Sequence, residues 1–219
     1  KIADCDWVIE VVVERLDIKQ QLFEKVEKYR KAGTLITSNT SGIPINMMAA
    51  GRSEDFRKHF CGTHFFNPPR YMRLLEIIPT TETDPSVVSF LMEYGDKMLG
   101  KTTVLCKDTP AFIANRVGVY AMAKIYQLTT EIGLTIEDVD AMTGPAIGRP
   151  KTGTFKLGDL VGHDTAANVI KGIKANCPND EQAGSFEIPK YLQFLLDNKF
   201  LGNKTGQGFY KKTKEKDAT

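Results

Sequence analysis

The sequence predicts an α/β protein whose first half alternates strands with helices and whose second half is entirely helical. Three observations lead to this prediction. Residues 7–13 form a short, continuous run rich in β-branched residues, strand-like and helix-like segments alternate as far as residue 106, and strand patterns stop after residue 108. With 219 residues, 42% of them apolar, the chain can bury a sizeable core in one large domain or two small ones.

The first half opens with strand, helix and strand, which is the repeating unit of a parallel sheet. The run 7–13 predicts a central strand buried on both faces, and residues 17–33 predict a helix capped by Asp17 and ended by Gly33. The remaining expected elements are strands at 34–38, 62–66, 73–78 and 102–106, and helices at 44–50 and 84–100.

Helical patterns fill the rest of the chain. Thr109 as cap and Pro110 as first helical residue predict a long helix over 108–133. Thr135 and Asp138 have the spacing of a capping box, which predicts a helix start there. Further helices are expected at 162–176 and 188–200, and the change of pattern predicts a domain boundary that divides the chain into 1–107 and 108–219.

Composition and charge exclude several classes of protein. The formal charge is only +2 and the basic residues are scattered, so we expect no nucleic-acid partner, and the basic run 211–216 is interpreted as a solvated tail. No stretch approaches the roughly 18 apolar residues of a membrane span. The four cysteines are isolated and lack metal-ligand spacing, which predicts reduced thiols, a cytoplasmic location and no metal site.

The chain begins with Lys1 rather than methionine and enters an apolar run within a few residues. We therefore expect that preceding sequence is missing. The dinucleotide-binding pattern GxGxxG does not occur, and the glycine-rich stretch 202–208 lacks a preceding strand and the order of a phosphate loop.

A histidine and a glutamate interrupt apolar segments in residues 61–77, "CGTHFFNPPRYMRLLEI". If the two strands form a symmetric hairpin, His64 lies opposite Glu76 with Cβ atoms about 4.5–5.5 Å apart. A carboxylate beside an imidazole fixes its tautomer and raises its basicity, which makes a general base. The alternative is a hydrogen-bonded core histidine, although a buried carboxylate is costly without a partner.

Polar residues also follow two predicted strands, at the edge where parallel sheets bind ligands. Ser41 lies in such a segment, where it either contacts a ligand or caps the next helix. Glu14 either accepts a hydrogen bond from a ligand or caps its own following helix. Asn115 is expected about a turn and a half into the long helix, near the positive end of the helix dipole, where it serves either a ligand or the adjacent loop.

Five motifs, in this order and at these spacings, closely resemble the 3-hydroxyacyl-CoA dehydrogenase family of fatty-acid β-oxidation. The resemblance covers essentially the whole chain, and the motifs are "SNTSG", "GTHFFNPP", "LLEIIP", "CKDTPAFIANR" and "NKTGQGFY". It implies the C-terminal part of a Rossmann-type NAD-binding domain, followed by an all-helical domain that forms a homodimer.

The resemblance also implies roles for individual residues in the oxidation of (S)-3-hydroxyacyl-CoA to 3-oxoacyl-CoA by NAD. His64 would be the general base, oriented by Glu76, and two residues would hydrogen-bond the substrate oxygens, namely Ser41 and Asn115. The implied cofactor contacts are Glu14, Lys19, Ser41, Asn67 and Lys204.

The front of the family's pattern, which carries GxGxxG, is absent from this sequence. We therefore expect weak NAD binding by the 219 residues alone. The bacterial and archaeal members that the chain most resembles can be fused to an enoyl-CoA hydratase, which is a possible partner here. Two alternatives stay open: a catalytically incomplete fragment that dimerises or binds acyl-CoA, and a relative that oxidises another hydroxy acid.

Overall fold

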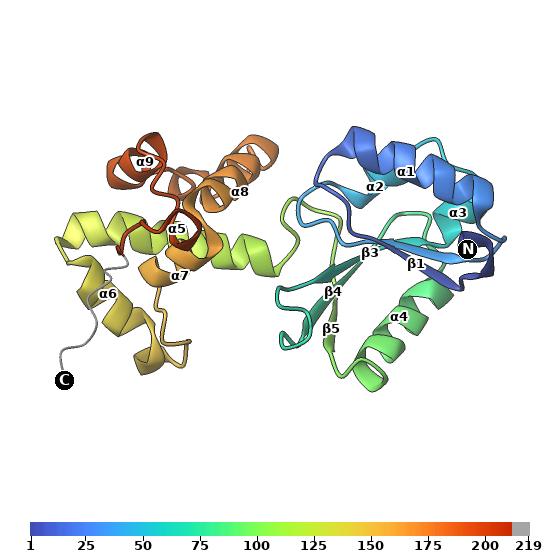
Figure 1. Cartoon of the computed structure of the whole chain (residues 1–219), viewed down its shortest axis with the longest axis horizontal. Coiled ribbons are helices and arrows are strands. Elements are labelled where there is room, and N and C mark those ends of the chain that lie inside the picture. The colour runs from blue at the N-terminus through green and yellow to red at the C-terminus, as the bar shows by residue number, and fades with distance from the viewer. Residues whose placement is uncertain (212–219) are drawn as a thin grey trace. The chain divides into compact units, whose positions relative to one another are not determined.

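The computed structural model describes residues 1–211, and the chain divides into two compact units, Lys1–Asn115 and Arg116–Thr219. Figure 1 shows strands only in the first of these units. All but the first residue of the basic run 211–216 lies outside the described residues.

The first unit is built on a five-stranded sheet in the order β1-β2-β3-β4-β5. Strands β1, β2 and β3 are parallel, β3 and β4 are antiparallel neighbours, and β5 is parallel to β4. The carboxyl ends of the first three strands therefore meet at one edge of the sheet. The strand bounds are Trp7–Glu10, Leu35–Ser38, Phe60–Phe65, Leu74–Pro79 and Thr102–Leu105.

Helices cover both faces of this sheet (Figure 1). On one face lie α1 (Leu16–Tyr29), α2 (Ile45–Ala49) and α3 (Glu54–Lys58), and their apolar side chains join the core around Phe23 and Phe60. On the other face lies α4 (Pro85–Lys97), which packs against the second apolar cluster of the sheet. Helices α1, α2 and α4 were expected from the sequence, but α3, a helix of five residues, was not.

The prediction for 7–13 is partly wrong. The strand ends at Glu10, and the valines that follow it are exposed. Within the described residues β1 pairs only with β2, so it is an outer strand, and Ile9 is 43% exposed. The β-branched sequence of β1 is typical of a central strand that is buried on both faces. In residues 1–211, however, β1 has a neighbouring strand along one of its two edges alone.

The long helix α5 begins at Ala114, five residues after the predicted cap at Thr109, and ends at Ile132. Ala111 and Phe112 have φ values of 62° and 48°, in the left-handed region, so the chain cannot enter a helix at Pro110. Asn115 is consequently the second residue of α5, and the prediction that placed it a turn and a half inside the helix is wrong.

In its described part the second unit consists of helices and connecting loops, with isolated β-bridges that join Gln207 to Gly202 and to Lys211. Thr135 caps α6 through the amide of Asp138, as predicted. Side chains of α5, α6, α7 and α9 form an apolar core that includes the stacked rings of Tyr126 and Phe155. The helices after α5 are α6 (Ile136–Thr143), α7 (Phe155–Val161), α8 (His163–Asn176) and α9 (Lys190–Asp197). Of all helices in residues 1–211, none combines the length and hydropathy that a membrane crossing requires.

Candidate active site

His64 and Glu76 face each other across β3 and β4, so the predicted register is confirmed. The Nδ1 atom of His64 lies 2.6 Å from the Oε2 atom of Glu76, and both side chains are buried. Because an ionised carboxylate can only accept a hydrogen bond, Nδ1 carries the ring proton and donates a hydrogen bond to Glu76. This hydrogen bond leaves Nε2 as the ring nitrogen that can accept a proton from a ligand.

Two aromatic rings pack against the imidazole and hold its plane. The ring centroids of Phe66 and Phe112 lie 4.5 and 5.6 Å from that of His64. Phe112 is itself buried, and it is one of the two residues with a positive φ before α5. The left-handed backbone at Phe112 thus accompanies an apolar ring that packs against the histidine.

The other carboxylate oxygen of Glu76 holds the start of α5. Its Oε1 atom accepts hydrogen bonds from the amides of Ile113 and Ala114, at 3.0 and 2.8 Å. These amides belong to the helix end that has no intrahelical acceptor for them. Glu76 therefore connects the His64 ring to the turn that carries the half-buried Asn115.

Burial alone would raise the pKa of Glu76, but its partners reverse that effect. The hydrogen bond with His64, the amide of Ala114, the charge of His64 and the amide of Ile113 together hold the pKa below its ordinary value of 4.5. The carboxylate is therefore ionised at neutral pH, as an orienter of an imidazole must be.

A Glu76→Gln substitution tests this electrostatic interpretation through its dependence on pH. Because the folded-state pKa is depressed, the ionised carboxylate stabilises the fold above pH 4.5, and this contribution is lost as the pH falls through the folded-state value. We expect Glu76→Gln to lower the free energy of unfolding by roughly 1–3 kcal/mol at neutral pH. The difference should shrink below pH 4.5, as measured by urea unfolding across a pH series.

The matched control is Glu93→Gln, which alters an exposed ion pair with Lys97 on α4. It should change the free energy of unfolding by less than about 1 kcal/mol. A Glu76→Gln effect that stays constant from neutral pH to well below 4.5 would contradict the assignment of an ionised Glu76.

The loop that follows β2 carries Ser41 and is tied to the strand that carries His64. The side-chain oxygen of Asn39 accepts a hydrogen bond from the amide of Phe65, at 2.9 Å. Ser41 itself is exposed, so its hydroxyl is accessible to a ligand. The alternative prediction made Ser41 the cap of α2. Instead, the carboxylate of Asp108 caps this helix, because it accepts hydrogen bonds from the amides of its first two residues, Ile45 and Asn46.

The carboxylate of Glu14 accepts hydrogen bonds from this loop. Its Oε1 atom accepts from the hydroxyl of Thr40 and from the amides of Ser41 and Gly42. Burial alone would raise the pKa of Glu14, but these hydrogen bonds and the nearby charge of Lys19 lower it. The side chain is still 40% exposed, so it lies within reach of a ligand at the edge of the sheet.

The other predicted cofactor contacts lie in different surroundings. Lys19 is 1% exposed, and its ammonium is held by Glu10. Asn67 is exposed two residues after the end of β3. Lys204 belongs to the second unit, where its ammonium pairs with Asp164. Sequence reasoning missed Glu10, although a charged residue in an apolar strand is the signal that singled out His64 and Glu76.

Fold and site together define an α/β protein with a buried imidazole–carboxylate pair near the edge where three parallel strands end. The NAD binding domain of the 3-hydroxyacyl-CoA dehydrogenase family matches residues 1–109, and the C-terminal domain of the same family matches residues 112–212. The chain belongs to the 3-hydroxyacyl-CoA dehydrogenase family.

Relatives from several organisms match nearly the whole chain. A probable 3-hydroxyacyl-CoA dehydrogenase of Bacillus subtilis is 49% identical over 97% of this chain and 27% of its own length. One from Deinococcus radiodurans is 46% identical over 100% of this chain and 62% of its own length. The chain thus spans between about a quarter and two thirds of the length of these two relatives.

A solved structure of the same family has the same fold as this chain. The crystal structure of (S)-3-hydroxybutyryl-CoA dehydrogenase from Ralstonia eutropha matches it with a TM-score of 0.87 and 27% identity, over 97% of this chain and 72% of that one. A putative trifunctional enzyme of the fatty acid oxidation complex in Rickettsia felis is 38% identical over 96% of this chain and 29% of its own length.

Proposed function

We propose that the protein containing this chain oxidises (S)-3-hydroxyacyl-CoA to 3-oxoacyl-CoA, with NAD as the hydride acceptor. The observation that carries the proposal is the buried pair of His64 and Glu76, joined at 2.6 Å and placed next to the loop of Ser41. Family membership supports it, because this chemistry needs one base and one hydride acceptor.

In this proposal Nε2 of His64 accepts the proton of the 3-hydroxyl group as the carbon gives up its hydride. The carboxylate of Glu76 stabilises the imidazolium that forms and keeps Nδ1 protonated throughout. Ser41 and Asn115 donate hydrogen bonds to the substrate oxygens. They lie on segments that are linked to the His64 strand through Asn39 and Glu76, respectively.

NAD, when bound, supplies the site that accepts the hydride. The residues that fit its nicotinamide and ribose are the exposed Ser41, the partly exposed Glu14 and the exposed Asn67, near the carboxyl ends of β1, β2 and β3. Parallel sheets bind nucleotides at this edge. The 219 residues contain no GxGxxG loop, so we assign no pyrophosphate contact to them. Lys204 remains a proposed contact from the second unit.

The partners and the domain roles are also proposals. We assign nucleotide binding to residues 1–107 and homodimer formation to the helical residues 108–219, as the family resemblance implies. The Rickettsia relative named as a trifunctional enzyme supports a fused or associated enoyl-CoA hydratase. A cytoplasmic location is also proposed, from the isolated cysteines of the sequence.

The test is the rate of NADH formation from 3-hydroxybutyryl-CoA, from longer 3-hydroxyacyl-CoA substrates and from the corresponding free hydroxy acids, measured on the natural gene product. We expect turnover with the CoA thioesters and little with the free acids. Preference for the free acids would favour a relative that acts on another hydroxy acid. Acyl-CoA binding without NADH formation would favour an inactive binding protein.

A further inference from the structure

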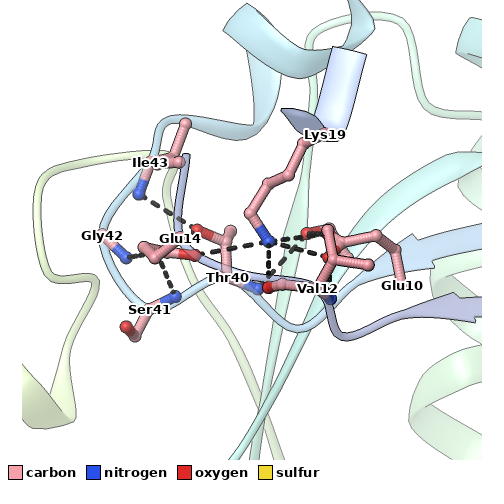
Figure 2. Close-up of polar contacts among 9 residues, drawn as sticks. Glu10, Val12, Glu14, Lys19, Thr40, Ser41, Gly42 and Ile43 are labelled. Carbon is pink, nitrogen blue, oxygen red and sulfur yellow. Dashed lines mark hydrogen bonds and ion pairs between the residues drawn. The ribbon is translucent and has the colours of Figure 1, made fainter. Parts of the chain in front are cut away.

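Glu10 is a buried carboxylate at the carboxyl end of β1, opposite Ser38 in the sheet register. Its oxygens accept four hydrogen bonds from three groups, as Figure 2 shows in part. Lys19 donates to both oxygens at 2.8 Å, the amide of Val12 donates at 2.6 Å, and the Ser38 hydroxyl donates at 2.5 Å. The carboxylate is therefore fully engaged within the protein.

Lys19 reaches this carboxylate from the first turn of α1, and its ammonium is as deeply buried as Glu10. Besides the two bonds to Glu10, it lies 3.4 Å from the carbonyl oxygen of Val12 and 3.3 Å from the Oε2 atom of Glu14 (Figure 2). An ammonium group has three protons, and these partners account for all of them. Lys19 therefore has no donor left for a ligand unless an internal bond is broken.

Glu14 links the ammonium of Lys19 to the Ser41 loop. One of its oxygens faces the ammonium of Lys19, and the other accepts the hydroxyl of Thr40 and two successive loop amides, from Ser41 and Gly42. Thr40 in turn accepts the amide of Ile43, so four consecutive residues take part. Figure 2 shows the Ser41 side chain directed away from this network.

We propose that Glu10 is a positioning residue of the dehydrogenase site, which holds Lys19 so that Lys19 aligns Glu14 and Glu14 sets the backbone of the Ser41 loop. The inference rests on the proposed function for its kinetic consequence, but not for its structural one. In this proposal Lys19 has an indirect role in binding NAD. Its ammonium positions Glu14 and does not contact the cofactor itself.

Charge balance explains why the chain of contacts depends on Lys19. One ammonium lies between two carboxylates, Glu10 and Glu14, which would otherwise repel each other in a poorly solvated place. Without the ammonium, Glu14 is driven outward to water, and the amides of Ser41 and Gly42 lose their acceptor. Without the charge of Glu10, Lys19 loses its principal partner and its fixed position.

The structural test is amide hydrogen exchange on the ligand-free protein. We compare wild type with Lys19→Met, Glu10→Gln and Glu14→Ala. In each variant the amides of Ser41 and Gly42 should exchange about tenfold faster or more, which is the loss expected for a hydrogen bond to a charged group. The strand segment 60–65 should keep its protection. Glu14→Ala changes a partly exposed side chain, so it tests the last step even if a buried variant fails to fold.

The control is Lys31→Met, which removes an exposed ion pair with Asp6 beside the start of β1. It should leave exchange at Ser41 and Gly42 unchanged. Unchanged exchange at these two amides in folded Glu10→Gln and Lys19→Met would overturn the proposal. A change that spreads equally over the whole first unit would also overturn it, since that is the result of a merely structural residue.

The kinetic test separates this inference from the proposed function. Lys19→Met and Glu10→Gln should raise KM for NAD about tenfold or more. They should raise KM for the acyl-CoA less, since Ser41 is its only proposed contact on this loop, whereas Lys31→Met should alter neither KM. An equal rise in both KM values would contradict a role on the cofactor side. If the protein forms no NADH at all, the proposed function fails, while the exchange result for the Ser41 loop still stands or falls by itself.

Discussion

A His64→Ala variant should lose turnover by about 10²–10⁴-fold, the range for removal of a general base. The variant loses Nε2 of His64, the atom proposed to take the hydroxyl proton. Glu76 does not replace it, because its carboxylate is oriented toward the imidazole and toward two helix amides. The fold should survive, since those amides still hold the carboxylate after the ring is gone. The measurement is kcat for NADH formation, together with a circular dichroism spectrum of the variant.

The control for this loss is His59→Ala. His59 directly follows α3 in the same unit, and its Nδ1 atom contacts the carbonyl oxygen of Asp55, outside the proposed site. It should keep kcat within about threefold of wild type. Near-normal turnover of 3-hydroxyacyl-CoA by His64→Ala would refute the assignment of this histidine as the base.

The largest effect on stability should come from Asp159→Ala in the second unit. Asp159 is buried, and its carboxylate accepts from the Nε2 atom of His163 at 2.7 Å and from the amides of Phe209 and Tyr210. Burial lowers the pKa of His163 more than Asp159 raises it, so the imidazole is a neutral donor. Alanine leaves three donors without an acceptor, which should cost about 3–5 kcal/mol.

The measurement is urea unfolding of Asp159→Ala followed by circular dichroism. Asp197→Ala is the control, because within residues 1–211 its carboxylate accepts one exposed side-chain bond, from Gln193 on α9. The control should lose less than about 1 kcal/mol. Equal losses in the two variants would show that Asp159 does not fasten the segment 202–210 to α7 and α8.

Local geometry made the central pair predictable. The side-chain period of a strand is two residues, so a symmetric connection between 64 and 76 determines which residues face each other, and the observed register agrees. The same kind of local rule found the cap of α6 at Thr135 and the parallel arrangement of β1 and β2.

Contacts between distant segments account for what the sequence did not reveal. The start of α5 is determined by a carboxylate on β4, which binds the amides of Ile113 and Ala114 across more than thirty residues of chain. The propensities of Thr109 and Pro110 carry no information about that partner. Likewise, the ion pair of Glu10 and Lys19 joins a strand to a helix, and it assigns Lys19 surroundings that a comparison of motifs could not show.

The most direct test of the central claim, that His64 and Glu76 act as one proton-transfer unit, is a double-mutant cycle on kcat. It compares wild type, His64→Ala, Glu76→Gln and the double variant in NADH formation from 3-hydroxybutyryl-CoA. We predict that the double variant is no slower than His64→Ala, because Glu76 acts on the reaction through the imidazole that is already missing. Losses that multiply across the two substitutions would contradict the account, since they would mean that the two residues contribute independently.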